Sequence, residues 1–187
     1  MKLSIIIPIK NEESLIEKIV TQLQSKLKSL SYEIIFINDF STDNTAKITK
    51  ELIKDKSQIN IYDNERKGLG GAISNGINVA NGDVVCIMMS DLSDNIDDLK
   101  KYYNIIKDEN VDAVFGSRFI VGSKIIDYPK KKLILNRIFN IITKLLFMSN
   151  YNDFTNAFKI YKKDALLKAF PLVSESFNIF LELPLKI

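Results

Sequence analysis

The chain has 187 residues, of which 46% are hydrophobic and 26% are charged, and its formal net charge is +3. This size and composition suit one well-buried domain, and they do not favour a protein that binds nucleic acid through its overall charge. The sequence contains no histidine, which excludes Ser-His-Asp catalysis and leaves carboxylates, lysines and tyrosines as candidate bases. The single cysteine, Cys86, excludes an internal disulfide and fits a reducing, cytoplasmic compartment.

Short apolar runs alternate with amphipathic stretches over the first part of the chain. The runs are rich in β-branched residues, as in strands buried on both faces of a parallel sheet. They occupy residues 3–9, 33–39, 59–64, 83–89 and 112–118. The stretches with helical spacing or capping residues occupy 12–30, 41–55, 72–81 and 95–109. This alternation predicts βαβ units, and therefore an α/β domain with a mostly parallel sheet and helices on both faces.

No segment predicts a signal peptide or a membrane span. The apolar stretch at the start of the chain is about half the usual length of a signal sequence and is interrupted by Pro8. No stretch reaches the roughly 18 uncharged apolar residues that a spanning helix requires.

Residues 130–148 form a basic and unusually apolar helical stretch. Three lysines stand at its start, at positions 130–132. Its polar residues share one narrow stripe, formed by Asn136, Arg137, Asn140, Thr143 and Lys144. The apolar arc is wider than a surface helix on a globular core needs. The helix is therefore expected either in a dimer or domain interface or in peripheral contact with a membrane surface.

Polar clusters follow four of the predicted strands. In open parallel sheets, ligands bind beyond the carboxyl ends of the strands, where such clusters meet. The clusters are PIKNEE (8–13), NDFSTDNT (38–45), NERKGLGGA (64–72) and SDLSDN (90–95). Together they predict a site for a polar, anionic ligand and a cation.

Each cluster taken alone also fits a structural role. Asp39 and Asp43 suit a helix cap, and Asp94 suits the positive end of a helix dipole. The GLGG turn does not follow the first strand, as a dinucleotide-binding fingerprint would, and it lacks the lysine-serine ending of a P-loop.

Several motifs in order along the chain resemble those of the inverting glycosyltransferases of family 2, and especially the polyprenyl-phosphate (dolichol-phosphate) sugar synthases. The resemblance covers essentially the whole chain. It rests on SIIIPIKNEE, EIIFINDFSTDNT, RKGLGGAISNGINVANGDVVCIMMSDLSDN, FGSRF, DFTNAFKIYKKDAL and ESFNIFLELPLK. It implies the GT-A fold and one domain over 1–187, with a nucleotide-sugar-binding half at 1–118 and an acceptor-side half at 119–187. Because family members often continue into further helical or transmembrane segments, the chain is read either as a short form or as a truncated one.

The resemblance also implies roles on the donor side. Contacts to the nucleotide-sugar are expected from Pro8, Asn11, Glu12, Asp39, Asp43, Lys67, Gly70 and Asp91. Asp91 would also hold Mg²⁺ or Mn²⁺, which neutralises the departing nucleoside diphosphate. Met89 stands where the family has its first D-x-D aspartate, so Ser93 or Asp94 is expected to supply the second oxygen ligand.

The acceptor determines what the other half of the chain must provide. A polyprenyl phosphate is already anionic and needs cations, for which Arg118, Lys159 and Arg137 are the candidates. Lys159 stands where the family commonly has arginine, and it replaces a bidentate fork with a point charge. A hydroxyl acceptor needs a catalytic base instead, for which Asp153 and Glu182 are the candidates, although both also fit structural roles.

The function predicted in this way is a metal-dependent, inverting transfer of a sugar from a nucleotide-diphospho-sugar to a polyprenyl phosphate or a cell-surface glycan precursor. The protein is expected to be cytoplasmic, either free or on the cytoplasmic face of a membrane, and a homodimer is an open alternative. A second hypothesis is a non-catalytic nucleotide-sugar-binding or partner subunit, because Met89 is a poor ligand for a hard cation. A sugar nucleotidyltransferase is disfavoured, because its glycine-rich, arginine-bearing N-terminal loop is absent.

Overall fold

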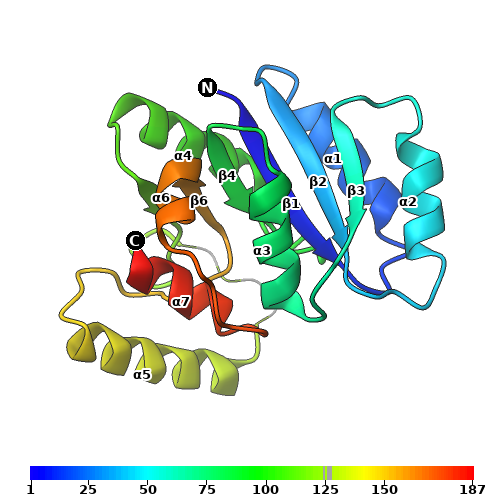
Figure 1. Cartoon of the computed structure of the whole chain (residues 1–187). Coiled ribbons are helices and arrows are strands. Elements are labelled where there is room, and N and C mark those ends of the chain that lie inside the picture. Colours follow the sequence, from blue (N-terminus) through cyan, green and yellow to red (C-terminus); the bar gives the residue numbers. More distant parts are fainter. Residues whose placement is uncertain (124, 126–127) are drawn as a thin grey trace.

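A six-stranded sheet runs through the protein in the order β3-β2-β1-β4-β6-β5 (Figure 1). The computed structural model describes residues 1–123, 125 and 128–187. The strands are β1 (Leu3–Ile9), β2 (Tyr32–Asn38), β3 (Ile59–Asp63), β4 (Val84–Ile87), β5 (Ala113–Phe115) and β6 (Lys159–Lys162). The helices are α1 (Ile16–Lys26), α2 (Thr45–Ile53), α3 (Leu69–Val79), α4 (Ile96–Asp108), α5 (Lys130–Leu146), α6 (Lys163–Lys168) and α7 (Ile179–Lys186).

The predicted mostly parallel sheet is confirmed, with one antiparallel addition. Strand β1 pairs in parallel with β2 and β4, and β2 pairs in parallel with β3. Strand β6, which the sequence pattern did not predict, runs antiparallel to both β4 and β5. Its four residues KIYK place lysines at both ends of a very short apolar run, which hides the strand in the sequence. Because β6 lies between β4 and β5, the two predicted halves of the chain share one sheet.

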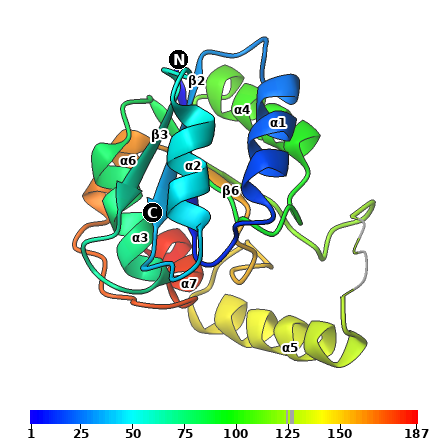
Figure 2. The same cartoon turned by 90° about the vertical axis from the view of Figure 1, so that its right-hand side faces the viewer.

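Helices cover both faces of the sheet, as the alternating pattern predicted (Figure 2). Helices α1, α2 and α4 pack on one face, where α1 contributes Ile16, Ile19 and Leu23 to the core. Helices α3, α6 and α7 pack on the other face. All seven residues of β1 are buried, which accounts for its unbroken apolar sequence.

Helix α5 lies apart from the sheet, along the lower edge of the molecule in both views (Figures 1 and 2). Its two buried residues are polar, Asn140 and Thr143. In contrast, Leu145 and Leu146 are 72% and 73% exposed. Of the polar stripe seen in the sequence, Asn136, Asn140 and Thr143 therefore face the protein, whereas Arg137 and Lys144 are exposed and most of the apolar arc faces outward. Among the described residues, no helix is long and apolar enough to cross a membrane.

Close packing of α3 on β1 generates a stability prediction at Gly76. A Cβ atom at this position would lie 2.4 Å from Cγ2 of Ile6. We expect Gly76→Ala to lower the free energy of unfolding by about 1–3 kcal/mol through overpacking, although alanine is the better helix former. The matched control is Asn78→Ala, at an exposed position of the same helix, which should change stability by less than about 0.5 kcal/mol. Urea denaturation measures both, and equal stabilities of the two variants would contradict the prediction.

Candidate functional site

The loops after β1 and β2 are tied together by hydrogen bonds beyond the carboxyl ends of these strands. The amide of Asn11 donates to Oγ of Ser41 at 3.1 Å, and the amide of Thr42 donates to Oδ1 of Asn11 at 2.8 Å. The amide of Glu12 donates to Oγ1 of Thr45 at 2.7 Å. The predicted residues Asn11 and Glu12 therefore hold the first two clusters against each other. The predicted residue Pro8 lies just before them, buried inside β1.

Asp39 is the buried carboxylate at the centre of these loops. Its Oδ1 accepts from Nδ2 of Asn64 at 2.7 Å and from the amide of Gly68 at 2.8 Å. Its Oδ2 lies 3.6 Å from Nζ of Lys10. Two neutral donors thus orient the carboxylate through Oδ1, while Oδ2 accepts no hydrogen bond from the residues that the structure describes. Asn64 was not among the predicted residues, although its place in the NERKGLGGA cluster was a signal.

Asp43 makes the contacts of a helix cap. Its carboxylate accepts from the amide of Thr45 at 3.0 Å and from the Thr45 hydroxyl at 2.5 Å. The Thr45 hydroxyl lowers the pKa of the Asp43 carboxyl. These bonds form at the start of α2, so the structural alternative accounts for Asp43, and its expected contact to the nucleotide-sugar stays a prediction.

A segment far along the chain covers the glycine turn. The amide of Gly70 donates to the carbonyl oxygen of Glu175 at 3.1 Å. A Cβ on Gly70 would lie 1.8 Å from the carbonyl oxygen of Ser174, so only glycine fits there. Gly68 has φ +108, a conformation that glycine adopts without strain. Lys67 beside them is exposed. Gly70 is predicted to lie near a nucleotide, but residues 174–175 already pack against it, so a nucleotide would have to bind beside these residues.

The fourth loop brings two aspartates to the end of β4. The exposed Asp91 accepts from the amide of Ser93 at 2.9 Å through Oδ1. Asp94 turns back toward the strand and accepts from the amide of Met89 at 3.3 Å. Burial raises the pKa of the Asp94 carboxyl to about 7. The Ser90 hydroxyl donates to Oε1 of Glu12 at 3.0 Å and ties this loop to the first.

The oxygen atoms of this loop suit a hard divalent cation that takes most of its ligands from phosphate and water. Within the described ranges, no three acidic or cysteine side chains gather around one point. A cation bridging two phosphates needs only one or two carboxylates. Asp91 is the accessible one, with Ser93 and Asp94 beside it, whereas the Met89 thioether is half-buried and packs against the core.

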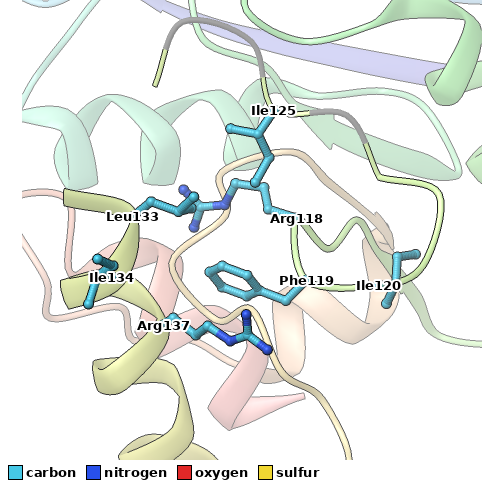
Figure 3. A pocket seen from close by; sticks show the side chains of 7 residues that line it. All are labelled: Arg118, Phe119, Ile120, Ile125, Leu133, Ile134 and Arg137. Atoms are coloured by element: carbon cyan, nitrogen blue, oxygen red, sulfur yellow. The ribbon is translucent and has the colours of Figure 1, made fainter. Parts of the chain in front are cut away.

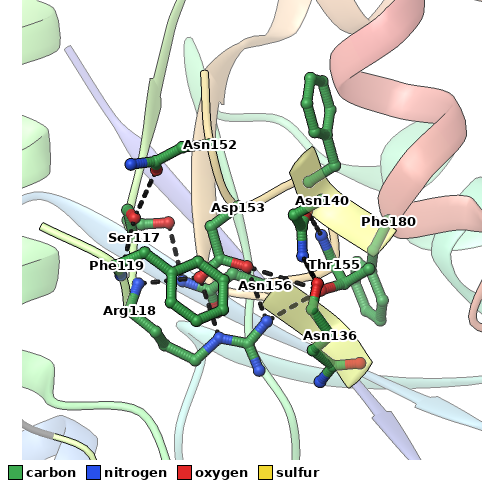
Figure 4. A network of polar contacts seen from close by, with 12 residues as sticks. Ser117, Arg118, Phe119, Asn136, Asn140, Asn152, Asp153, Thr155, Asn156 and Phe180 are labelled. Atoms are coloured by element: carbon green, nitrogen blue, oxygen red, sulfur yellow. Dashed lines mark hydrogen bonds and ion pairs between the residues drawn. The ribbon is translucent and has the colours of Figure 1, made fainter. Parts of the chain in front are cut away.

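A second polar cluster centres on Arg118 and Asp153 (Figure 4). Nε and Nη2 of Arg118 donate to the carboxylate of Asp153 at 2.9 and 2.6 Å, and the Arg118 amide donates at 2.8 Å. Asp153 is completely buried. Both of its oxygens are engaged, so Asp153 does not fit the predicted role of a base. It acts instead as a positioning residue for the guanidinium of Arg118.

Arg118 and Arg137 line a shallow hollow of about 290 Å³ next to α5 (Figure 3). The guanidinium carbons of the two arginines lie 5.6 and 5.9 Å from the ring centroid of Phe119. Cations near an aromatic ring are held by its electron-rich face. The structure thus brings together two of the three cations predicted for an acceptor phosphate.

Lys159 lies elsewhere and does not fit its predicted role. It is completely buried in β6. Its ammonium donates to the carbonyl oxygens of Phe154, Asn156 and Phe180. Burial lowers the pKa of the ammonium to about 7. A lysine enclosed in this way ties the loop before β6 to α7, and it is not among the residues that line the hollow.

Glu182 is also a structural residue. Its carboxylate accepts from the amides of Val173 and Ser174 at 3.0 and 2.8 Å, and it pairs with Lys186 at 2.7 Å. Burial alone would raise the pKa of Glu182, but the Lys186 ammonium and the two amides outweigh burial and bring the pKa to about 2. So weak a base does not fit the predicted role in deprotonating a hydroxyl. The carboxylate holds the segment that covers the glycine turn.

Comparison with known proteins identifies the family. The model of glycosyl transferase family 2 matches residues 4–170. The chain belongs to this family. Proteins that are similar to it include a dolichol-phosphate mannosyltransferase of Pyrococcus furiosus, 31% identical over 137 residues, and a dolichyl-phosphate beta-glucosyltransferase of Dictyostelium discoideum, 28% identical over 186 residues. These matches cover 73% and 90% of this chain, and 39% and 56% of the relatives.

A solved structure shows the same fold. Glucosyl-3-phosphoglycerate synthase of Mycobacterium tuberculosis, in complex with Mn²⁺, UDP and glucosyl-3-phosphoglycerate, aligns with a TM-score of 0.73 at 17% identity. The alignment covers 98% of this family 2 chain and 63% of the synthase. The predicted GT-A fold is therefore confirmed. The chain spans less than two thirds of each of these three proteins.

The contacts of Glu182 generate a pH-dependent prediction. The pKa of Glu182 falls from its ordinary value of 4.5 to about 2 on folding. The carboxylate therefore contributes stability above about pH 4.5 that is lost as the pH falls toward 2. We expect Glu182→Gln to lower the free energy of unfolding by about 1–2 kcal/mol at pH 7.

Urea denaturation of both proteins at pH 7 and pH 3 checks this expectation. The difference between variant and wild type should shrink at pH 3, because the Glu182 carboxyl of the unfolded chain, with its ordinary pKa of 4.5, is mostly protonated there and must lose its proton on folding. A difference that stays the same at both values would show that the ionised form of Glu182 does not support the fold.

Proposed function

We propose that this family 2 glycosyltransferase moves a sugar, with inversion, from a nucleoside-diphosphate sugar to a polyprenyl phosphate or a related phosphate-bearing glycan precursor. The observation that carries the proposal is the contrast between two clusters. Asp39 and Asp91 keep carboxylate oxygens available for a donor and its cation. Both candidate bases, Asp153 and Glu182, are fully engaged, whereas the hollow is lined by Arg118, which Asp153 holds in place, and by Arg137, whose charge is left for an anion.

The donor would bind across the strand-end loops of residues 1–118. Oδ2 of Asp39 suits an N–H group of a nucleobase, and the loops held by Asn11 and Glu12 keep that carboxylate in place. Asp91, with Ser93 or Asp94, would hold Mg²⁺ or Mn²⁺ against the diphosphate. The bound cation would supply charge neutralisation where the leaving group develops negative charge.

The acceptor would approach through residues 119–187. A phosphate oxygen is already anionic, so it attacks the anomeric carbon without losing a proton, and the bond to the nucleoside diphosphate breaks as the new bond forms. Arg118 and Arg137 would orient the phosphate. Asp153 supports this task by fixing the guanidinium of Arg118. Because both predicted bases, Asp153 and Glu182, are engaged in other contacts, they would serve a hydroxyl acceptor poorly, whereas a phosphate acceptor needs no base.

A second candidate function is a non-catalytic nucleotide-sugar-binding subunit. The observation in its favour is Met89, which occupies a ligand position of the family with a thioether that a hard cation binds poorly. Metal-dependent binding of a nucleotide separates the two hypotheses.

We expect one of UDP, GDP and dTDP to bind more tightly in the presence of Mn²⁺, with the enhancement lost in Asp91→Ala. Removing a direct ligand should cost roughly tenfold or more in affinity for the metal-bound nucleotide, because even outer partners of ligands contribute that much. Isothermal titration calorimetry measures the binding. The control is Asp97→Ala, which removes an exposed aspartate of α4 that pairs with Lys26 of α1. Equal affinities with and without Mn²⁺ would favour the non-catalytic subunit.

A second experiment addresses the acceptor. We expect Arg137→Gln to raise KM for a polyprenyl phosphate about tenfold or more, because a charge-assisted contact is lost, while affinity for the nucleotide stays unchanged. Initial-rate kinetics with radiolabelled donor measure the effect. The control is Lys168→Gln, an exposed cation on α6. Unchanged KM in Arg137→Gln would remove the hollow from the acceptor site.

A further inference from the structure

Helix α5 attaches to the protein through its polar side. Nδ2 of Asn140 donates to Oγ1 of Thr155 at 3.0 Å, and Nδ2 of Asn136 donates to the hydroxyl of Tyr128 at 2.6 Å. These partners lie in loops, whose polar groups need hydrogen bonds, and not in the apolar core. The orientation is the reverse of that of α1, which turns its apolar side to the sheet.

The outward side of α5 is a continuous apolar surface. Six of its aliphatic side chains are more than half exposed: Ile134, Leu135, Ile138, Ile141, Leu145 and Leu146. Neighbouring Phe147 and Met148 extend the surface past the end of the helix, with exposed fractions of 57% and 92%. A contiguous apolar surface of this kind marks an interaction site, because exposing it to water is unfavourable.

A second apolar element stands beside the helix. In the turn at residues 119–123, Ile120 and Val121 are exposed, and Val121 extends fully into solvent. Ile120 lines the same hollow as Leu133 and Ile134 of α5, with Arg118 and Arg137 between them (Figure 3). The two arginines therefore lie between two exposed apolar elements.

The charges of this region all have one sign. Residues 128–152 contain five basic residues and no aspartate or glutamate. The five are Lys130, Lys131, Lys132, Arg137 and Lys144. In a two-fold dimer of α5 with itself, the same patch would face its copy, and these charges would meet no acidic partner within the segment. An anionic lipid surface offers both an apolar layer and the opposite charge.

We propose that α5 and the 119–123 turn dock the protein onto the surface of an anionic lipid bilayer. The helix lies in the plane of the surface, with Leu135, Leu145 and Leu146 in the acyl region and the lysines at 130–132 among the headgroups. The docking goes beyond the proposed transfer reaction, since it needs neither donor nor acceptor. It would place the hollow lined by Arg118 and Arg137 at the level of the lipid headgroups.

Co-sedimentation of the chain with lipid vesicles tests this docking. The probes are vesicles of phosphatidylcholine alone and vesicles that also contain phosphatidylglycerol. We expect the chain to bind the anionic vesicles. Leu146→Glu should lower the affinity about tenfold or more, because it removes a buried leucine and adds a negative charge that the anionic lipid repels. The triple change of lysines 130–132 to glutamine should weaken binding to the anionic vesicles by about fivefold per lysine.

The matched control is Leu167→Glu, which places the same change on an exposed leucine of α6, away from the docking surface. It should bind vesicles like the wild type. Circular dichroism and thermal unfolding verify that each variant is folded. Vesicle binding that Leu146→Glu does not alter would overturn the proposal. It would also be overturned if the chain did not bind vesicles but formed a dimer in analytical ultracentrifugation, and if Leu146→Glu dissociated that dimer.

Because no nucleotide or transfer step is measured, failure of vesicle binding would leave the proposed reaction standing. Failure of nucleotide binding in calorimetry would likewise leave the docking surface standing.

Discussion

Pairing of β1 with parallel neighbours on both sides is the constraint on which the loops of the proposed donor site depend. The pairing brings the ends of β1, β2 and β4 to one edge of the sheet. Backbone bonds extend the pairing into the loops, from the amide of Asp39 to Ile9 and from the amide of Met88 to Ile6. Because β1 is wholly buried, its register cannot slip without moving its side chains out of the core. The polar loops are therefore held by an apolar framework.

The two clusters of the protein use carboxylates in opposite ways. In the strand-end loops, Asp39 is oriented by two neutral donors at Oδ1, and Asp91 is exposed, which suits their proposed contacts to a sugar donor and its cation. Next to α5, the buried Asp153 pairs with Arg118, and Arg137 lines the hollow, which suits the proposed contact to an acceptor phosphate. This arrangement follows from desolvation, because a buried carboxylate without a cation beside it would be costly.

Helix α5 shows that amphipathic spacing does not reveal which side of a helix meets the protein. Its polar stripe fits onto loops through Asn136 and Asn140, because loop backbone and hydroxyl groups require partners that aliphatic side chains cannot supply. Its apolar side is left outward as a consequence. The basic residues along the helix distinguish this surface from an ordinary core face.

The sequence by itself determined the local elements of this protein, and the tertiary structure decided how distant polar groups pair. Strands β1, β2 and β4 are buried and have unbroken apolar runs, so these strands and the clusters at their ends were readable from residue order. The partly buried strands β3 and β5 were readable from their shorter runs. Strand β6 was not readable, because four residues carry too little periodicity and their pairing partners lie far along the chain. The contacts of Arg118, Asp153 and Lys159 could not be predicted from residue order either. Residue type shows that a side chain can be charged, but only the folded chain shows which partner neutralises it and whether a ligand can reach it.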